Sequence, residues 1–269
     1  MKVLRAGEVT VLKFESFEKE ICVEHCFTAR SGGCSDGEFE SLNMGMYTDD
    51  KLENVVENYR RVSRDVFCAD VTQCVLSKQV HKTEIAVVSK EDMGNGVTKS
   101  QKYEEIDGLV TDEREVVLST VYADCTPLFF VDPEKKVVGV AHAGWRGTVG
   151  KIGSKMVEIM ASRYGSDRKD ILVGIGPTIG SCCYTVKEDV ASQFKKAFLD
   201  CSKILEQLGE GQYRLNLWEA NKASVMESGV PESNIELDSH CTSCNEELFY
   251  SYRRDQGKTG RMAAMIKLK

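Results

Sequence analysis

The stretch ADCTPLFFVDPEKKVVGVAHAGWRGT, residues 123–148, contains two apolar runs and the rarest side chains of this chain. The runs, 128–131 and 137–141, are short, rich in Val and Phe and bounded by turn residues, which is the pattern of buried β-strands. Asp132 and Pro133 between them stand where a type I turn favours these residue types. The stretch therefore predicts an antiparallel hairpin.

This hairpin would bring a cysteine and a histidine together. If Asp132 faces Lys135 across the turn, the same register places Cys125 opposite His142. The Cβ atoms of directly opposed residues lie roughly 4.5–5.5 Å apart, close enough to share a metal ion or a proton. A type I turn is not the favoured two-residue hairpin connection, so a slip of a residue or two is open. After such a slip, Cys125 and His142 would no longer face each other directly but would still lie close together.

A helix is predicted to follow the hairpin, because five apolar residues between 149 and 160 recur at helical spacing. Gly144 and Gly147 at its start would leave backbone N–H groups free to meet an anion. Arg146 between them adds a fixed positive charge. The Cys/His pair would then lie beside a phosphate-binding helix start.

The length and composition indicate one domain. The 269 residues are 42% hydrophobic with only four prolines and no linker or repeat, so we expect a single domain over residues 1–269. The formal net charge of −7 argues against nucleic-acid binding, which usually needs a basic surface. No run approaches 18 apolar residues and no signal-peptide pattern is present, so we expect a cytoplasmic protein with no membrane partner. The oligomeric state is left open.

Eleven cysteines are many for such a chain. Without a signal peptide a disulfide framework is not expected, so most are predicted to be reduced, small and mostly buried. Cys241 and Cys244 have the spacing of a zinc knuckle. The only pair that could complete it, Cys182 and Cys183, lacks that spacing, and we do not expect a four-cysteine site.

The rest of the chain mixes helix and strand patterns. Helices are expected over 50–67, about 187–199 and about 218–228. A strand through residues 75–76 should lead to a histidine at position 81, with residues 85–88 as its partner strand.

Two arginines outside the hairpin are further candidates for anion binding. Arg30 lies in a long loop dense in Gly, Ser and Asp, where it either reaches a ligand or is an ordinary exposed arginine. Arg253 lies near a turn beside aromatic residues, which suits phosphate, a nucleobase or a surface ion pair. Asp124, directly before Cys125, is either a proton shuttle or the cap of a turn.

His81, Cys125 and His142 form a candidate metal-binding set. Two nitrogens and one sulfur suit Zn²⁺, and a fourth position left open is more typical of catalysis than of structure. The residues alone leave two alternatives: a Cys125/His142 nucleophile pair without metal, as in a cysteine hydrolase of the amidase or peptidoglycan-editing type, and an inert core.

Motifs along nearly the whole chain carry a family resemblance. They run in order from residue 27 to the C-terminus and read TARSGGCS with SLNMG, KQVH, DGLVT, ADCTPLFF, VGVAHAGWRGT, GIGPTIGSCCYTV, and FYSYRRD with KTGR. They resemble the YfiH-type laccase-domain family, described as purine nucleoside phosphorylases and formerly as copper polyphenol oxidases or bacterial peptidoglycan editing factors. The resemblance implies that His81, Cys125 and His142 bind Zn²⁺. Copper is the alternative metal, although four histidines cannot furnish the several His-rich sites of a multicopper oxidase.

The resemblance also implies the fold and the reactions. The fold is an α+β, single-domain, layered α/β/β/α arrangement with mixed, largely antiparallel sheets, which agrees with the mixed patterns above. The reactions are phosphorolysis of adenosine, inosine, guanosine and S-methyl-5'-thioadenosine to free base and ribose 1-phosphate, and deamination of adenosine to inosine. Purine nucleosides and phosphate are therefore the expected partners. Asp124 and Arg146 are the expected catalytic residues, and Arg30, Asn43 and Arg253 the expected substrate-binding residues.

Overall fold

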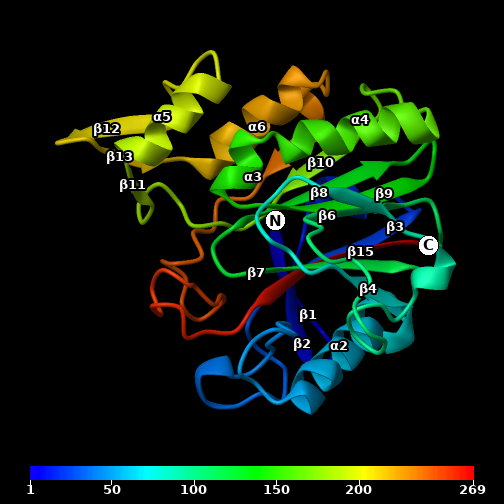
Figure 1. Cartoon of the computed structure of the whole chain (residues 1–269). Coiled ribbons are helices and arrows are strands. Elements are labelled where there is room, and N and C mark those ends of the chain that lie inside the picture. Colours follow the sequence, from blue (N-terminus) through cyan, green and yellow to red (C-terminus); the bar gives the residue numbers. More distant parts are fainter.

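The computed structural model describes residues 1–269 and contains two six-stranded sheets, a third small sheet and six α-helices (Figure 1). In spatial order, the strands of the first sheet are β1 (Lys2–Ala6), β2 (Val9–Lys13), β3 (Val23–Thr28), β15 (Met262–Leu268), β7 (Val117–Tyr122) and β4 (Cys74–Leu76). Those of the second sheet are β14 (Ile235–Leu237), β10 (Leu172–Ile175), β8 (Thr126–Asp132), β9 (Val137–Ala143), β6 (Gly108–Thr111) and β5 (Ile85–Val87).

The remaining elements are a three-stranded sheet and the helices. The small antiparallel sheet has the order β11 (Thr185–Lys187), β13 (Gln212–Leu215) and β12 (Leu205–Gly209). The helices are α1 (Glu15–Glu18), α2 (Leu52–Phe67), α3 (Trp145–Val149), α4 (Ile152–Tyr164), α5 (Glu188–Ala197) and α6 (Leu217–Glu227). None of them combines the length and the apolar character that crossing a membrane requires.

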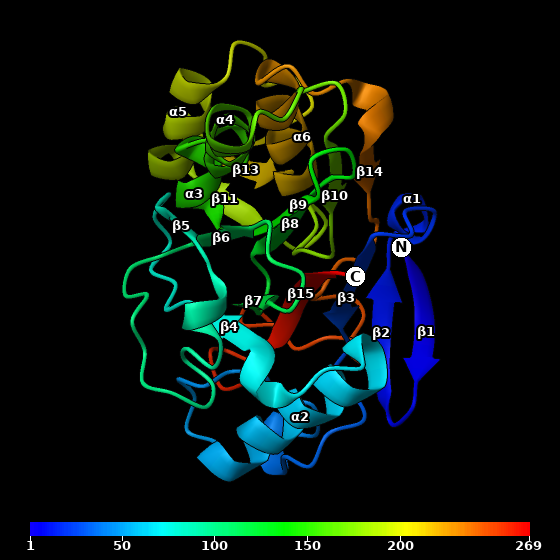
Figure 2. The same ribbon diagram turned by 90° about the vertical axis from the view of Figure 1, so that its right-hand side faces the viewer.

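The two large sheets and their helices form four layers, α2, first sheet, second sheet, and α4 with α6 (Figure 2). Buried aromatic and branched residues such as Phe27 and Phe129 fill the space between the sheets. Tyr59 of α2 packs on the first sheet, and Met156 of α4 packs on the second. The predicted α/β/β/α arrangement is therefore confirmed, with both parallel and antiparallel strand pairs.

The predicted hairpin is formed by β8 and β9, with a register shifted by two residues. Pro127 rather than Cys125 faces His142. The shift arises in the turn. The Asp132 carboxylate accepts the backbone N–H groups of Glu134 and Lys135, each at 2.9 Å, and Lys136 adopts a left-handed conformation with φ 56°. These contacts hold a longer loop than the predicted two-residue turn. A shift of two keeps every side chain on its predicted face.

Two further predictions are corrected by the structure. The strand before His81 and the strand after it are not partners: β4 pairs in parallel with β7 in the first sheet, and β5 with β6 in the second. The connection that carries His81 therefore crosses from one sheet to the other. The helix expected after the hairpin is divided into α3 and α4, because Lys151 between them is left-handed with φ 57°.

Candidate active site

A cavity of about 530 Å³ opens beside the start of β8 and the end of β9. Residues from both large sheets, from α3 and α6 and from the segment before β15 line it. Its volume lies within the range of small-molecule sites. Four aromatic side chains and three arginines stand on its walls, namely Tyr47, Trp145, Tyr184, Tyr252, Arg146, Arg253 and Arg261.

His81, Cys125 and His142 meet on the surface of this cavity. Their ligand atoms lie within 4.8 Å of one another, and the two imidazole centroids are 4.8 Å apart. His81 comes from the connection between the sheets, Cys125 directly precedes β8, and His142 lies on β9. The structure thus brings together the three side chains that the sequence singled out, from three separate segments.

Gly144 lies against all three of these side chains. A Cβ atom at this position would lie 2.9 Å from Cδ2 of His81, 3.2 Å from Sγ of Cys125 and 3.8 Å from Cε1 of His142. Only a glycine lets the backbone pass so close to the cluster. No further His, Cys, Asp or Glu joins the group, so two imidazoles and one thiol face the cavity. This donor set fits a zinc ion with an open fourth position.

Asp107, fully buried, orients both histidines. Its Oδ1 lies 2.9 Å from Nδ1 of His142 and accepts the backbone N–H of His81 at 2.9 Å. Its Oδ2 accepts the backbone N–H of Lys82 at 2.8 Å. The contact to Nδ1 leaves Nε2 of His142 as the nitrogen available to a metal ion. This aspartate is the first residue of the DGLVT motif and had no predicted role; an acidic residue directly before a buried strand was the available signal.

Cys125 and His142 influence each other's ionisation. Burial opposes the thiolate, but His142 and His81 outweigh it and lower the pKa of Cys125 to about 6. Burial also opposes the imidazolium, yet Cys125 and Asp107 raise the pKa of His142 to about 9. Between these two pKa values, the shifts favour a thiolate at Cys125 beside an imidazolium at His142. A thiolate is both the form of cysteine that binds zinc and the form that acts as a nucleophile.

Asp124, next to the cluster, serves as a brace between segments. Its φ of 84° is rare for a residue with a side chain and is held by tertiary contacts. Oδ1 accepts the hydroxyl of Thr242 at 2.6 Å, and Oδ2 accepts the backbone N–H of Arg253 at 2.7 Å. The Asp124 carbonyl accepts the N–H of Ile179 at 2.9 Å. These bonds support a positioning role, and the proton-shuttle role stays a prediction.

Three arginines supply positive charge to the cavity. The guanidinium of Arg146 lies 4.2 Å from the ring centroid of Trp145, and that of Arg253 lies 5.2 Å from the ring centroid of Tyr184. Arg261, which the sequence places in the same arginine-rich turn region as Arg253, donates to two backbone carbonyls of its own loop. None of the three pairs with a carboxylate side chain. Their charge is therefore available to an anionic ligand.

The N-terminus of α3 contributes less positive charge to the cavity than the sequence predicted. The helix after the hairpin, α3, has only five residues and ends at Gly150. A helix of one turn and a half sums few peptide dipoles, so its N-terminus carries little of the partial charge of a long helix. The positive character of the cavity comes from the arginine side chains.

Two residues predicted to bind substrate lie outside the cavity. The Arg30 guanidinium donates to the backbone carbonyl of Glu40 and stacks 4.8 Å from the ring centroid of Tyr250. Asn43 is fully buried, and its Oδ1 accepts the backbone N–H of Arg261 at 2.9 Å. Asn43 therefore holds the backbone of Arg261, which lines the cavity, and Arg30 stabilises the loop that contains Glu40.

Comparison with known proteins identifies the family of the chain. The family model described as "Multi-copper polyphenol oxidoreductase laccase" matches residues 24–269. The chain belongs to this laccase family. It is similar to "Purine nucleoside phosphorylase YlmD" of Geobacillus stearothermophilus, with 43% identity over 89% of this chain and 88% of that protein. The protein of the same name from Bacillus subtilis is 41% identical over 90% of this chain and 87% of the relative.

Solved structures of the laccase family share the whole architecture. The crystal structure of the Bacillus licheniformis hypothetical protein YfiH superposes with a TM-score of 0.94 at 38% identity, covering 99% of each chain. The crystal structure of YlmD from Geobacillus stearothermophilus gives a TM-score of 0.93 at 39% identity, covering 100% of this chain and 98% of that one.

The histidines do not support the multicopper chemistry in the laccase family's description. His25 accepts the backbone N–H of Phe14 at 2.8 Å in an aromatic cluster, and burial lowers its pKa to about 3. His240 lies 2.9 Å from the carboxylate of Asp238. Only two of the four histidines line the cavity. Several histidine-rich copper sites cannot be built from this set.

Proposed function

We propose that this chain is a zinc-dependent purine nucleoside phosphorylase. The observation that carries the proposal is a cluster of two imidazoles and one thiolate that opens into a cavity with both aromatic rings and unpaired arginines. Aromatic faces stack on a purine, and guanidinium groups bind phosphate. Relatives named purine nucleoside phosphorylase, with identities above 40%, support the assignment.

In phosphorolysis, a phosphate oxygen forms a bond to C1′ of the ribose while the bond from C1′ to the purine nitrogen breaks. The departing base gains a proton and ribose 1-phosphate remains. Arg146 and Arg253 would hold the phosphate against C1′, since charge-assisted contacts to phosphate are strong and directional. Tyr184 and Trp145 would stack on the nucleoside. The expected substrates are adenosine, inosine, guanosine and S-methyl-5'-thioadenosine.

The proposed metal ligands are His81, Cys125 and His142, and the proposed metal is Zn²⁺. When bound, the ion supplies Lewis acidity and lowers the pKa of a coordinated water, which is the chemistry that deamination of adenosine to inosine requires. Asp107 would hold His142 in the tautomer that exposes Nε2 to the ion. Gly144, which has no Cβ atom, would leave room for the ligand side chains beside the backbone.

A second candidate is favoured by the ionisation of the cysteine. The lowered pKa of Cys125 and the raised pKa of His142 are also those of a cysteine hydrolase. There the Cys125 thiolate would attack an amide carbon, His142 would protonate the departing amine, and water would release the acid from the thioester. Such an enzyme would need no metal.

One experiment separates the two candidates. The purified full-length protein is incubated with a nucleoside panel, with and without phosphate, and the products are identified by mass. Phosphate-dependent release of free base and ribose 1-phosphate, with zinc at the cavity that is lost in Cys125→Ser, is the expected result. Cys68→Ser, which removes an exposed thiol at the end of α2, is the matched control. A metal-stripped enzyme that keeps full activity and is inactivated by alkylation of Cys125 would overturn the proposal in favour of the hydrolase.

A further inference from the structure

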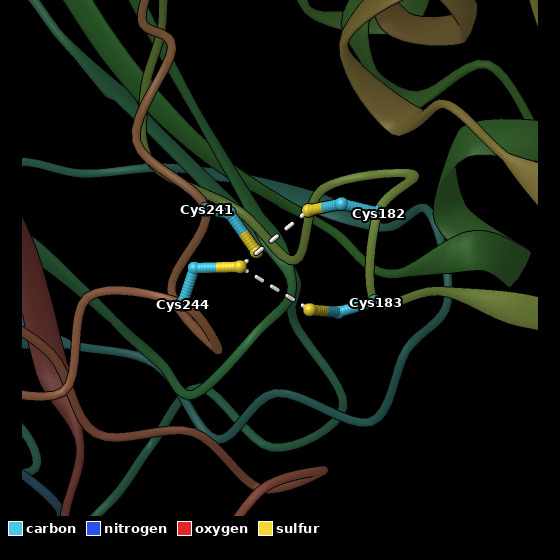
Figure 3. Close-up of side chains that lie close together, drawn as sticks. All are labelled: Cys182, Cys183, Cys241 and Cys244. Carbon is cyan, nitrogen blue, oxygen red and sulfur yellow. Dashed lines mark hydrogen bonds between the residues drawn. The ribbon is translucent and has the colours of Figure 1, made fainter.

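Four cysteine side chains meet outside the cavity (Figure 3). The sulfurs of Cys182, Cys183, Cys241 and Cys244 lie within 4.8 Å of one another and point toward a common centre. Sγ of Cys244 is 3.6 Å from Sγ of Cys182 and 3.4 Å from Sγ of Cys183. A disulfide bond measures about 2.05 Å, so these are four separate thiols. A four-cysteine site was not expected from the sequence, yet the structure brings these four thiols together.

Strand pairing explains why two distant pairs of cysteines meet. The strands β10 and β14 run in parallel, with Ile175 paired to Leu237, so the chain leaves both at the same edge of the sheet. The two segments continue side by side, since the N–H of Thr242 donates to the carbonyl of Thr178 at 3.0 Å. The first segment then delivers the vicinal cysteines, and the second delivers the C-x-x-C pair.

The two cysteine segments are held in place by hydrogen bonds of their own. The backbone N–H of Gly180 donates to Sγ of Cys241 at 3.1 Å, a contact that favours a thiolate. The Cys241 carbonyl accepts the N–H of Cys244 at 3.2 Å and the amide of Asn245 at 2.8 Å. Arg254 donates to the carbonyl of Thr242 at 3.1 Å. These hydrogen bonds hold the two cysteine segments in place.

We propose that these four cysteines bind a second Zn²⁺ ion at a structural site. A zinc–sulfur distance of about 2.3 Å places tetrahedral thiolates about 3.8 Å apart, close to the separations at Cys244. Four protein thiolates complete the coordination shell, so the ion has no position left for a substrate. Each thiol that binds gives up its proton.

This ion would hold together two chain segments that line one side of the cavity. The segment with Cys182 and Cys183 also carries Ile179 and Tyr184, and the segment after Cys244 carries Arg253; these three residues line the cavity. Asp124 already joins the same two segments by hydrogen bonds, as described above. The zinc site would be the second fastening, and its residues would act as positioning residues without touching substrate.

The metal count tests the proposal without reference to the reaction. The full-length protein is purified under reducing conditions, loaded with zinc, desalted and measured by mass spectrometry of metals. We expect two zinc ions per chain in the unmodified protein, one in Cys125→Ser, one in Cys244→Ser and none in the double variant. Cys68→Ser, an exposed thiol at the end of α2, should keep both. One ion per chain that disappears with Cys125 alone would overturn the proposal.

Two further measurements cover a variant that fails to fold and a redox explanation. Cobalt loaded into Cys125→Ser should give the intense sulfur-to-metal absorption of a multi-thiolate site, and its absence would count against the proposal. The mass of the intact protein is also measured before and after reduction. A metal-free protein that gains the mass of two hydrogens on reduction contains a disulfide, and the cysteines would then form a redox pair instead of a zinc site.

The effect on the cavity wall rests on the proposed function. Loss of the cluster ion in Cys244→Ser should lower the thermal midpoint by roughly 5–10 °C. It should raise KM for nucleosides several-fold while kcat changes less and the cavity zinc stays bound. If no nucleoside is turned over, the proposed function fails while the metal count still decides the second site. If KM is unchanged and the metal count falls by one, the site exists and does not position the wall.

Discussion

The two sulfur-containing clusters differ in the number of donors and in the space beside them. The cluster of His81, Cys125 and His142 offers three donors and faces a cavity of about 530 Å³. The four-cysteine cluster lies outside that cavity, and two of its thiols are exposed. Three ligands with open space beside them allow chemistry, whereas four ligands can only hold the chain.

The supporting contacts of the two clusters differ in the same sense. Asp107 is a fully buried carboxylate that contacts the His142 ring and accepts the backbone N–H of His81. It therefore fixes the orientation of the His142 ring and places a negative charge beside it. The four-cysteine cluster is supported by a backbone N–H from Gly180 and by a turn at Cys241. A catalytic metal needs tuned ligands, and a structural one needs only a preformed shape.

The largest effect is expected at the thiol of the cavity. Cys125→Ser keeps the size of the side chain and removes the soft ligand, so the cavity zinc should be lost and turnover should fall on the order of 10³-fold or more. The four-cysteine zinc should remain, as measured by metal content in parallel with activity. Loss of both ions in this variant would mean that the clusters do not bind independently.

An arginine substitution tests whether the cavity cluster works beside a phosphate site. Arg146→Ala should weaken phosphate-dependent base release about 10- to 100-fold, because a charge-assisted contact contributes ~1.5–3 kcal/mol. Both zinc ions should stay bound, and deamination of adenosine, which uses water, should fall less. Arg60→Ala, on α2, is the control. An equal fall of both activities would show that Arg146 is not a dedicated phosphate ligand, and no change would favour Arg253.

Local patterns predicted the elements, and long-range pairing decided the sites. The hairpin and α2 follow from apolar spacing, which depends on neighbouring residues alone. The register of the hairpin did not follow, because the Asp132 carboxylate and the left-handed Lys136 lengthen the turn. The mixed layers were expected from the mixture of patterns and from the family resemblance.

The two sets of candidate metal ligands were predictable to different degrees, because one depends partly on local pairing and the other on long-range pairing. Cys125 and His142 lie on one hairpin, so their proximity follows from the sequence. His81 reaches them on a connection that crosses between sheets. Its residue type and the family resemblance suggested it as the third ligand, but local spacing did not show that it lies beside the other two. The C-x-x-C spacing was a local signal for only half of the four-cysteine cluster. The other half joins it through the parallel pairing of β10 and β14, which brings together segments about 60 residues apart.

The pH dependence of thiol alkylation compares the two clusters directly. In metal-stripped protein, Cys125 should react as a thiolate with an apparent pKa of about 6, because His142 and His81 stabilise its negative charge against burial. Its alkylation rate should rise as pH increases through 6 and then level off. Cys182, whose pKa is raised chiefly by burial, should become reactive only at higher pH. Peptide mapping after timed alkylation, with roughly a 10-fold difference expected at pH 7, measures both.

The smallest effect is expected at the bond that connects the two clusters. Thr242 lies within the C-x-x-C segment, and its hydroxyl donates to Oδ1 of Asp124, the neighbour of Cys125, at 2.6 Å. Thr242→Val keeps the volume and removes the donor, which should cost about 1–3 kcal/mol of stability because a buried carboxylate oxygen loses its partner. KM for nucleosides should rise about 2- to 5-fold, since Asp124 also holds the backbone of Arg253.

Both zinc ions should remain in Thr242→Val, since neither cluster loses a ligand. Thr242→Ser, which keeps the hydroxyl, should restore KM. If Thr242→Val changes stability alone, the four-cysteine cluster and the cavity are neighbours without functional coupling. If KM rises with both ions in place and returns with serine, Asp124 transmits the position of the knuckle to the cavity wall, and the structural cluster contributes to catalysis through geometry alone.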